Sequence, residues 1–163
     1  MTGVQTCALP IPLSPEEIGR AAELIHSINK NITVLVDNCY GEFTDILEPT
    51  HHGADVCAGS LIKNPGGGLA PTGGYICGRK DLIDRISFRL TAPGIGREEG
   101  SYAGSYRPFY QGLFMAPHAV CQALKTAVLA AAVFSSLGME TTRSPVKNAM
   151  TSFRPSSWGP PKS

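Results

Sequence analysis

A short run of strand-forming residues that ends in an acid constrains the fold of this chain more than any other feature. Ile32–Val36 is β-branched at four of its five positions and closes on Asp37, which is typical of a strand buried in a parallel sheet. A helix is predicted just before it, because Ser14 can cap, Pro15 suits the first helical position and Glu17 completes a capping box. A helix followed by a buried strand indicates an α/β fold.

The rest of the interior continues this alternation. Short strands are predicted near Val56–Ala58 and at Gly74–Cys77. Helices are predicted at Asp81–Leu90 and at Pro117–Leu137, where a proline opens the helix and a glycine follows it. The glycine-rich segment Thr91–Arg107 between them predicts a loop. We therefore predict an α/β fold with a mostly parallel sheet and flanking helices.

Composition and charge exclude several classes of protein. The 163 residues suffice for about one domain. With 14 basic and 13 acidic residues the net charge is +1, so we expect no nucleic-acid partner. The longest apolar run, Ala127–Phe134, is far shorter than the ~20 residues of a membrane span, and we expect no membrane segment. The five scattered cysteines predict reduced thiols in a cytoplasm.

Both ends of the chain differ from its interior. Met1–Ile11 resembles the translated read-through of a sequencing-library adapter, and we expect residues 1–11 to be a non-native segment. Residues 144–163 are rich in serine and proline, which predicts a disordered terminus. A frameshift near Arg143 is the alternative, because Met150–Gly159 can be recoded in a shifted frame as an amphipathic segment. The folded part is therefore expected to span residues 12–143.

The candidate site lies at the tips of two neighbouring predicted strands. Asp37 follows the first strand, and Lys63 follows the second and opens into the loop Asn64–Gly68. Ligands of open α/β sheets bind beyond the carboxyl ends of strands. A desolvated lysine has a lowered pKa and attacks carbonyls, and a carboxylate can keep a cofactor's pyridine nitrogen protonated. The alternatives are a capping role for Asp37 and a solvated loop lysine at position 63.

Three strings in this region resemble a known family. VDNCYGEF, GAD and SLIKNPGGGLAPTGGYICG resemble the core of fold-type I pyridoxal-phosphate enzymes, and most closely the methionine gamma-lyase-like family often labelled aluminium resistance proteins. The resemblance covers about Leu13–Thr142. It implies that Lys63 attaches pyridoxal 5'-phosphate covalently, that Asp37 faces the pyridine nitrogen and that Ser60 contacts the phosphate. Ile62 stands where related lyases usually carry threonine.

This resemblance implies a function. The chain is expected to be a cytoplasmic carbon–sulfur lyase that depends on pyridoxal phosphate and eliminates a thiol from a sulfur amino acid. A transaminase or decarboxylase is an alternative, because the same lysine and acid serve those reactions. Family members are far longer, so residues 12–143 are expected to be part of the large cofactor domain, weakly active by itself and homo-oligomeric in the full-length protein. A non-catalytic truncated remnant is the third alternative.

Other residues were weighed as sites. His51–His52 with Asp55 or Cys57 could bind a metal, but adjacent histidines point apart on a regular element, and we expect no metal site. Cys39 and Cys57 are expected to be small core residues. The loop Thr91–Tyr106 is expected near the cofactor or at a subunit interface.

Overall fold

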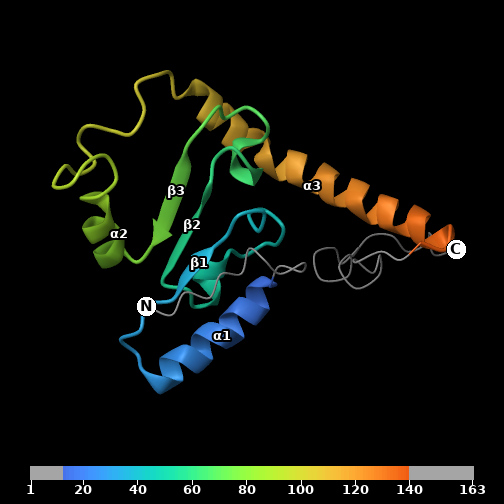
Figure 1. Cartoon of the computed structure of the whole chain (residues 1–163), viewed down its shortest axis with the longest axis horizontal. Helices are drawn as coiled ribbons and strands as arrows, with labels where there is room; N and C mark the ends of the chain where they lie inside the picture. Colours follow the sequence, from blue (N-terminus) through green and yellow to red (C-terminus); the bar gives the residue numbers. More distant parts are fainter. Residues whose placement is uncertain (1–12, 140–163) are drawn as a thin grey trace, which may run out of the picture. The chain divides into compact units, whose positions relative to one another are not determined.

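The computed structural model describes residues 13–139. Within them the chain forms three α-helices, three β-strands and two short 3-10 helices (Figure 1). In chain order these are α1 (Pro15–Ile28), β1 (Leu35–Asp37), η2 (Pro49–His52), β2 (Val56–Ser60), η3 (Asn64–Gly66), β3 (Gly74–Gly78), α2 (Lys80–Ser87) and α3 (Arg107–Ser136). Every strand and helix expected from the sequence is therefore present, with shifted ends.

The three strands form one sheet in the order β1-β2-β3. β1 and β2 are parallel, with Leu35 opposite Val56, and β2 and β3 are antiparallel, with Gly59 opposite Tyr75. The α/β prediction is confirmed, whereas the mostly parallel sheet is confirmed for β1–β2 and wrong for β2–β3. The segment 38–55 is long enough to bring the chain back beside β1 in the same direction, whereas the loop 61–73 simply reverses it.

The capping box predicted for α1 is present. Glu17 N–H donates to Ser14 Oγ (3.2 Å) and Ser14 N–H donates to Glu17 Oε2 (2.8 Å). The buried face of α1 contains Gly19 and Ala22, and a Cβ at Gly19 would press against His52 of η2. Small residues therefore allow α1 to pack closely on η2.

The core is centred on β2 instead of β1. Val56 and Cys57 are almost fully buried, which confirms the core role predicted for Cys57. In β1, by contrast, Leu35 is 63% exposed. The predicted burial of this strand is wrong within the described residues, because β1 pairs there with β2 on one side only.

Helix α3 begins ten residues before the predicted start. Pro117 lies inside it, although the sequence rule places proline in the first turn. Contacts with the residues just before the helix accompany the true start: Ser105 Oγ accepts from Arg107 N–H, and the rings of Tyr102 and Phe109 pack edge to face, with their centroids 5.1 Å apart. At its far end Gly138 adopts φ 78°, as expected for a glycine that follows a helix.

The chain divides into two compact units, Met1–Val120 and Cys121–Ser163. The first holds the sheet and α3 up to Val120, and the second holds the rest of α3. By length and composition α3 could cross a membrane, a property that core helices of soluble proteins share. The expectation of no membrane segment considered only uninterrupted apolar runs. Helix α3 has polar residues between its apolar ones and is still apolar on average.

Candidate functional site

The first part of the site is a turn at the end of β1. Asp37 lies opposite Ala58 of β2, and the pairing continues because Asn38 N–H donates to Ala58 O (2.8 Å). The Asp37 carboxylate accepts from Cys39 N–H (3.1 Å), which forms an aspartate-type turn. Asp37 is exposed at this strand tip. The turn thus places a carboxylate at the carboxyl end of the sheet, as the sequence predicts.

The second part is a turn at the end of β2. Ser60 Oγ accepts from Ile62 N–H (3.3 Å), and Ser60 O accepts from Lys63 N–H (3.3 Å). These two bonds bring the half-buried Lys63 back towards the end of β1. Its Nζ lies 4.5 Å from the centroid of the Tyr40 ring.

Lys63 reaches the turn that follows Asp37. Cys39 hydrogen-bonds to Lys63, and this contact, together with the nearby Asp37 charge, raises the pKa of the lysine. Desolvation acts in the opposite direction but is outweighed. The predicted lowering of the Lys63 pKa is therefore wrong for this chain. Burial and the neighbouring Asp37 also raise the pKa of the Cys39 thiol, which lies at the site instead of in the core.

The glycines after Lys63 have a packing role that the sequence analysis did not anticipate. A Cβ on Gly67 would overlap Gly112 O, and a Cβ on Gly112 would overlap Gly66 O. Gly67 also has φ 53°, which disfavours other residues. These glycines let the loop backbone touch the backbone of α3.

The loop between β1 and η2 contains two strained residues. Tyr40 (φ 67°) and Phe43 (φ 60°) adopt left-handed conformations, which are uncommon outside glycine and cluster at functional sites. Glu48 holds the loop, because its carboxylate accepts from Phe43 N–H (3.0 Å) and from Asn38 Nδ2 (2.9 Å). Sequence reasoning missed Tyr40, Glu42 and Glu48, since nothing in the pattern separates a buried acid from a solvated one.

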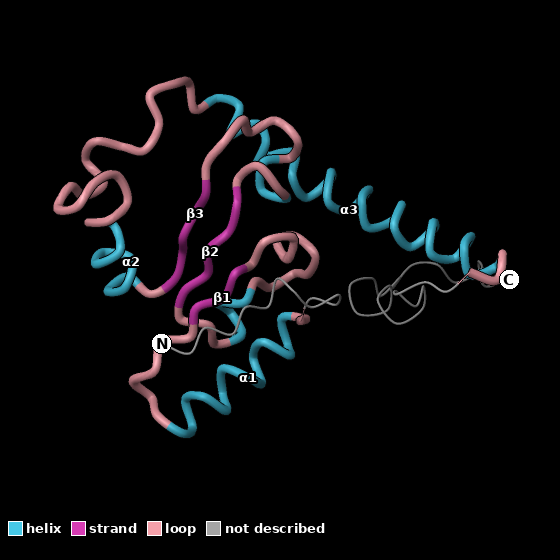
Figure 2. The backbone as a smooth tube through the Cα atoms, in the orientation of Figure 1, coloured by secondary structure: helices cyan, strands magenta, loops and turns pink. Residues whose placement is uncertain are grey.

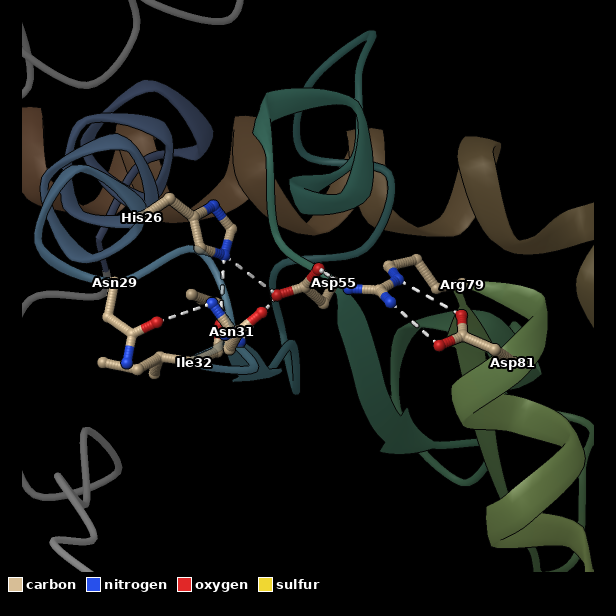
Figure 3. Close-up of polar contacts among 8 residues, drawn as sticks. His26, Asn29, Asn31, Ile32, Asp55, Arg79 and Asp81 are labelled. Atoms are coloured by element: carbon tan, nitrogen blue, oxygen red, sulfur yellow. Dashed lines mark hydrogen bonds and ion pairs between the residues drawn. The ribbon is translucent and has the colours of Figure 1, made fainter.

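A buried aspartate at the opposite ends of the same strands fixes their pairing (Figure 3). Asp55 accepts from Val34 N–H (2.8 Å) and Arg79 Nη1 (3.0 Å), and it contacts His26 Nε2 at 3.1 Å. Burial alone would raise the pKa of Asp55, but these three partners outweigh it and lower the pKa. The cluster joins the end of α1, the starts of β1 and β2, and the segment that leads into α2.

The candidate metal ligands are not gathered into a site. His51 and His52 lie in η2, while Asp55 contacts His26. Across residues 13–139, no three His, Cys, Asp or Glu side chains lie close enough together to hold a metal ion.

The loop between α2 and α3 is confirmed as irregular (Figure 2). Its Arg97 Nη2 donates to Asp84 Oδ1 of α2 (2.7 Å). This contact joins the loop to α2, and its expected closeness to a cofactor or a subunit interface stays a prediction.

Comparisons with known proteins extend this geometry. A crystal structure from Clostridium novyi, named as a carbon-sulfur lyase involved in aluminium resistance, matches 83% of this chain at 51% identity and a TM-score of 0.79, and the match covers 32% of its own length. A candidate cystathionine beta-lyase involved in aluminium resistance from Listeria innocua matches 87% of this chain at 49% identity and a TM-score of 0.82, over 35% of its own length.

Curated sequences agree with this result. Protein YnbB of Bacillus subtilis, named as uncharacterized, is 55% identical over 122 residues, which are 75% of this chain and 29% of the relative. The chain thus spans about a third of the length of the proteins it matches. The sequence model described as methionine gamma-lyase matches residues 10–151. Because that match covers most of the 163 residues, the chain belongs to the methionine gamma-lyase family, the family that the site motifs resemble.

Proposed function

We propose that this chain carries the cofactor-attachment part of a carbon–sulfur lyase that uses pyridoxal 5'-phosphate and acts on a sulfur amino acid. The observation that carries the proposal is the placement of Asp37 at the end of β1 and of Lys63 just after the neighbouring β2, and the hydrogen bond of Lys63 with Cys39, two residues after Asp37, supports it. The names of the relatives support the carbon–sulfur class. A fold-type I cofactor domain is part of the same proposal.

The side chains at the strand tips have the chemistry that this cofactor requires. Lys63 offers a primary amine for its aldehyde, and Asp37 offers a carboxylate for its ring nitrogen. Ser60 Oγ accepts a hydrogen bond from the turn, so its own hydrogen stays available to a phosphate oxygen. When bound, pyridoxal phosphate supplies an electron sink for carbanion chemistry.

The protein's own groups then have distinct tasks. Lys63 must first lose a proton, since the contact with Cys39 raises its pKa and favours the ammonium form. Once deprotonated, an amine at this position can attack a carbonyl and later move a proton as a general base. The Asp37 carboxylate would sustain a positive charge on the ring nitrogen, which is what makes the ring a good electron acceptor.

Covalent trapping tests this proposal. The chain is mixed with pyridoxal phosphate, reduced with borohydride to convert any lysine-bound cofactor into a stable amine, and mapped by peptide mass spectrometry. Lys63 should carry most of the label, well above the exposed Lys30, and Lys63→Arg should remove that excess. Equal labelling of the two lysines would contradict the proposal and leave a non-catalytic remnant.

The reaction type needs a separate measurement. Release of thiol and ketoacid from a sulfur amino acid supports the lyase, whereas amino-group transfer or carbon dioxide release supports a transaminase or a decarboxylase. We propose that this chain, which spans only part of the length of its relatives, is weakly active by itself. A cytoplasmic location and homo-oligomers of the full-length protein, with no nucleic-acid or membrane partner, are part of the proposal.

A further inference from the structure

Glu42 is a buried acid that the proposed chemistry does not use. Its side chain is 3% exposed, and its Oε1 accepts from the Tyr75 hydroxyl (2.9 Å). Its Oε2 is a buried side-chain oxygen with no hydrogen-bond partner among the described residues. Gly59 of β2 provides the space, because a Cβ there would overlap Oε1. An ionised carboxylate is costly in such a place, and the neutral acid is favoured.

Glu42 contacts both halves of the candidate site. Its backbone carbonyl accepts from Asn64 Nδ2 (2.9 Å), and Asn64 directly follows Lys63. Through Tyr75 it also reaches Asn38, the residue that directly follows Asp37, because Asn38 Nδ2 donates to the Tyr75 hydroxyl (3.4 Å). One residue is thus joined by hydrogen bonds to the turn that carries the acid and to the turn that carries the amine.

Three titratable groups face Glu42 from the surrounding elements. Tyr75 of β3 donates a hydrogen bond, Cys57 lies on β2, and Glu48 approaches from the segment before η2. Burial raises the pKa of Glu42 and the Glu48 charge adds to that rise, while hydrogen bonds from the backbone of Glu42 and Tyr40 and from the Tyr75 hydroxyl oppose it. Glu48 itself accepts from Asn38 and Phe43. Ionisation of Glu42 therefore places a second negative charge in this network.

We propose that Glu42 is a positioning residue for the candidate site. Its carboxyl group holds the Tyr75 hydroxyl and through it Asn38, the neighbour of Asp37, while its backbone carbonyl holds Asn64, the neighbour of Lys63. Ionisation of Glu42 loosens that arrangement. The inference rests on the proposed function, because it concerns the same lysine and acid. It adds that their arrangement depends on pH.

Cofactor trapping across pH tests the positioning role. The label at Lys63, divided by that at Lys30, is measured for the wild type and for Glu42→Gln between pH 5 and 8.5. Glutamine keeps an acceptor for Tyr75 and stays neutral, so the wild-type to variant ratio of this label should fall several-fold as pH rises across this range. Glu42→Ala should lower the Lys63 label at every pH, and the exposed Glu23→Gln should match the wild type.

The urea midpoint separates this inference from the proposed function. A group whose pKa is raised by folding contributes stability that is lost as pH rises through the folded pKa. The wild type should therefore lose stability relative to Glu42→Gln as pH rises, whether or not Lys63 is labelled. Absence of labelling at Lys63 together with this shift would overturn the proposed function only. Parallel pH profiles of the two proteins in both measurements would overturn the role of Glu42.

Discussion

Replacing Asp55 with alanine removes the carboxylate that ties the start of β1 to the start of β2. The Asp55 side chain is 8% exposed and accepts from Val34 N–H at 2.8 Å. Leaving that half-buried N–H unsatisfied costs about 1–2 kcal/mol, and losing the His26 contact adds about 0.5–1 kcal/mol. Arg79 adds nothing to this figure, because its exposed guanidinium keeps water and Asp81 as partners.

The free energy of unfolding should therefore fall by about 1.5–3 kcal/mol in Asp55→Ala. Urea denaturation followed by far-ultraviolet circular dichroism measures this at pH 7. Asp55→Asn should lose about half as much, since one amide oxygen can still accept from Val34. The exposed Glu23→Ala should stay within about 0.5 kcal/mol of the wild type. A loss of less than about 0.5 kcal/mol in Asp55→Ala would refute the view that Asp55 holds the strands together.

Three further outcomes are expected. Because folding lowers the pKa of Asp55, its contribution to stability is present above the unfolded value of about 3.9 and is lost as pH falls through the folded pKa. When the urea midpoint is measured at falling pH, the wild type should therefore show a loss of stability that Asp55→Asn does not show. Gly112→Ala should lower the free energy of unfolding by about 1–3 kcal/mol, because the new Cβ overlaps the Gly66 carbonyl, and it should reduce labelling of Lys63. The control Gln111→Ala, at the exposed neighbouring position of the same helix, should do neither. Cys39→Ala should shift labelling of Lys63 to lower pH, because loss of the thiol contact lowers the lysine pKa; an unshifted profile would show that the contact has no effect.

Features set by local interactions could be predicted from the sequence. The α1 capping box needs residues only three apart, and it forms as predicted. The ends of the two strands are equally local, so Asp37 and Lys63 could be placed at them from the sequence pattern, whereas Ser60 was implied by the family resemblance alone. Their roles toward a cofactor stay predictions.

Features set by distant partners could not be predicted. The start of α3 was missed for another reason, because Pro117 lies inside the helix and departs from the usual position of proline at a helix start. The exposure of β1 depends on which strands flank it. The burial of Glu42 depends on Gly59 of β2 and Tyr75 of β3, which are distant in sequence, so no neighbouring residue could reveal it.

The Asp55 cluster and the candidate site lie at opposite ends of the same strand pair. The register that sets Leu35 opposite Val56 also sets Asp37 opposite Ala58. A slip of one residue would move the carboxylate by about 3.3 Å and turn it to the other face of the sheet. The bond between Asp55 and Val34, at the start of the pair, opposes that slip. The position of the acid relative to Lys63 is therefore determined in part by an aspartate that does not touch either residue.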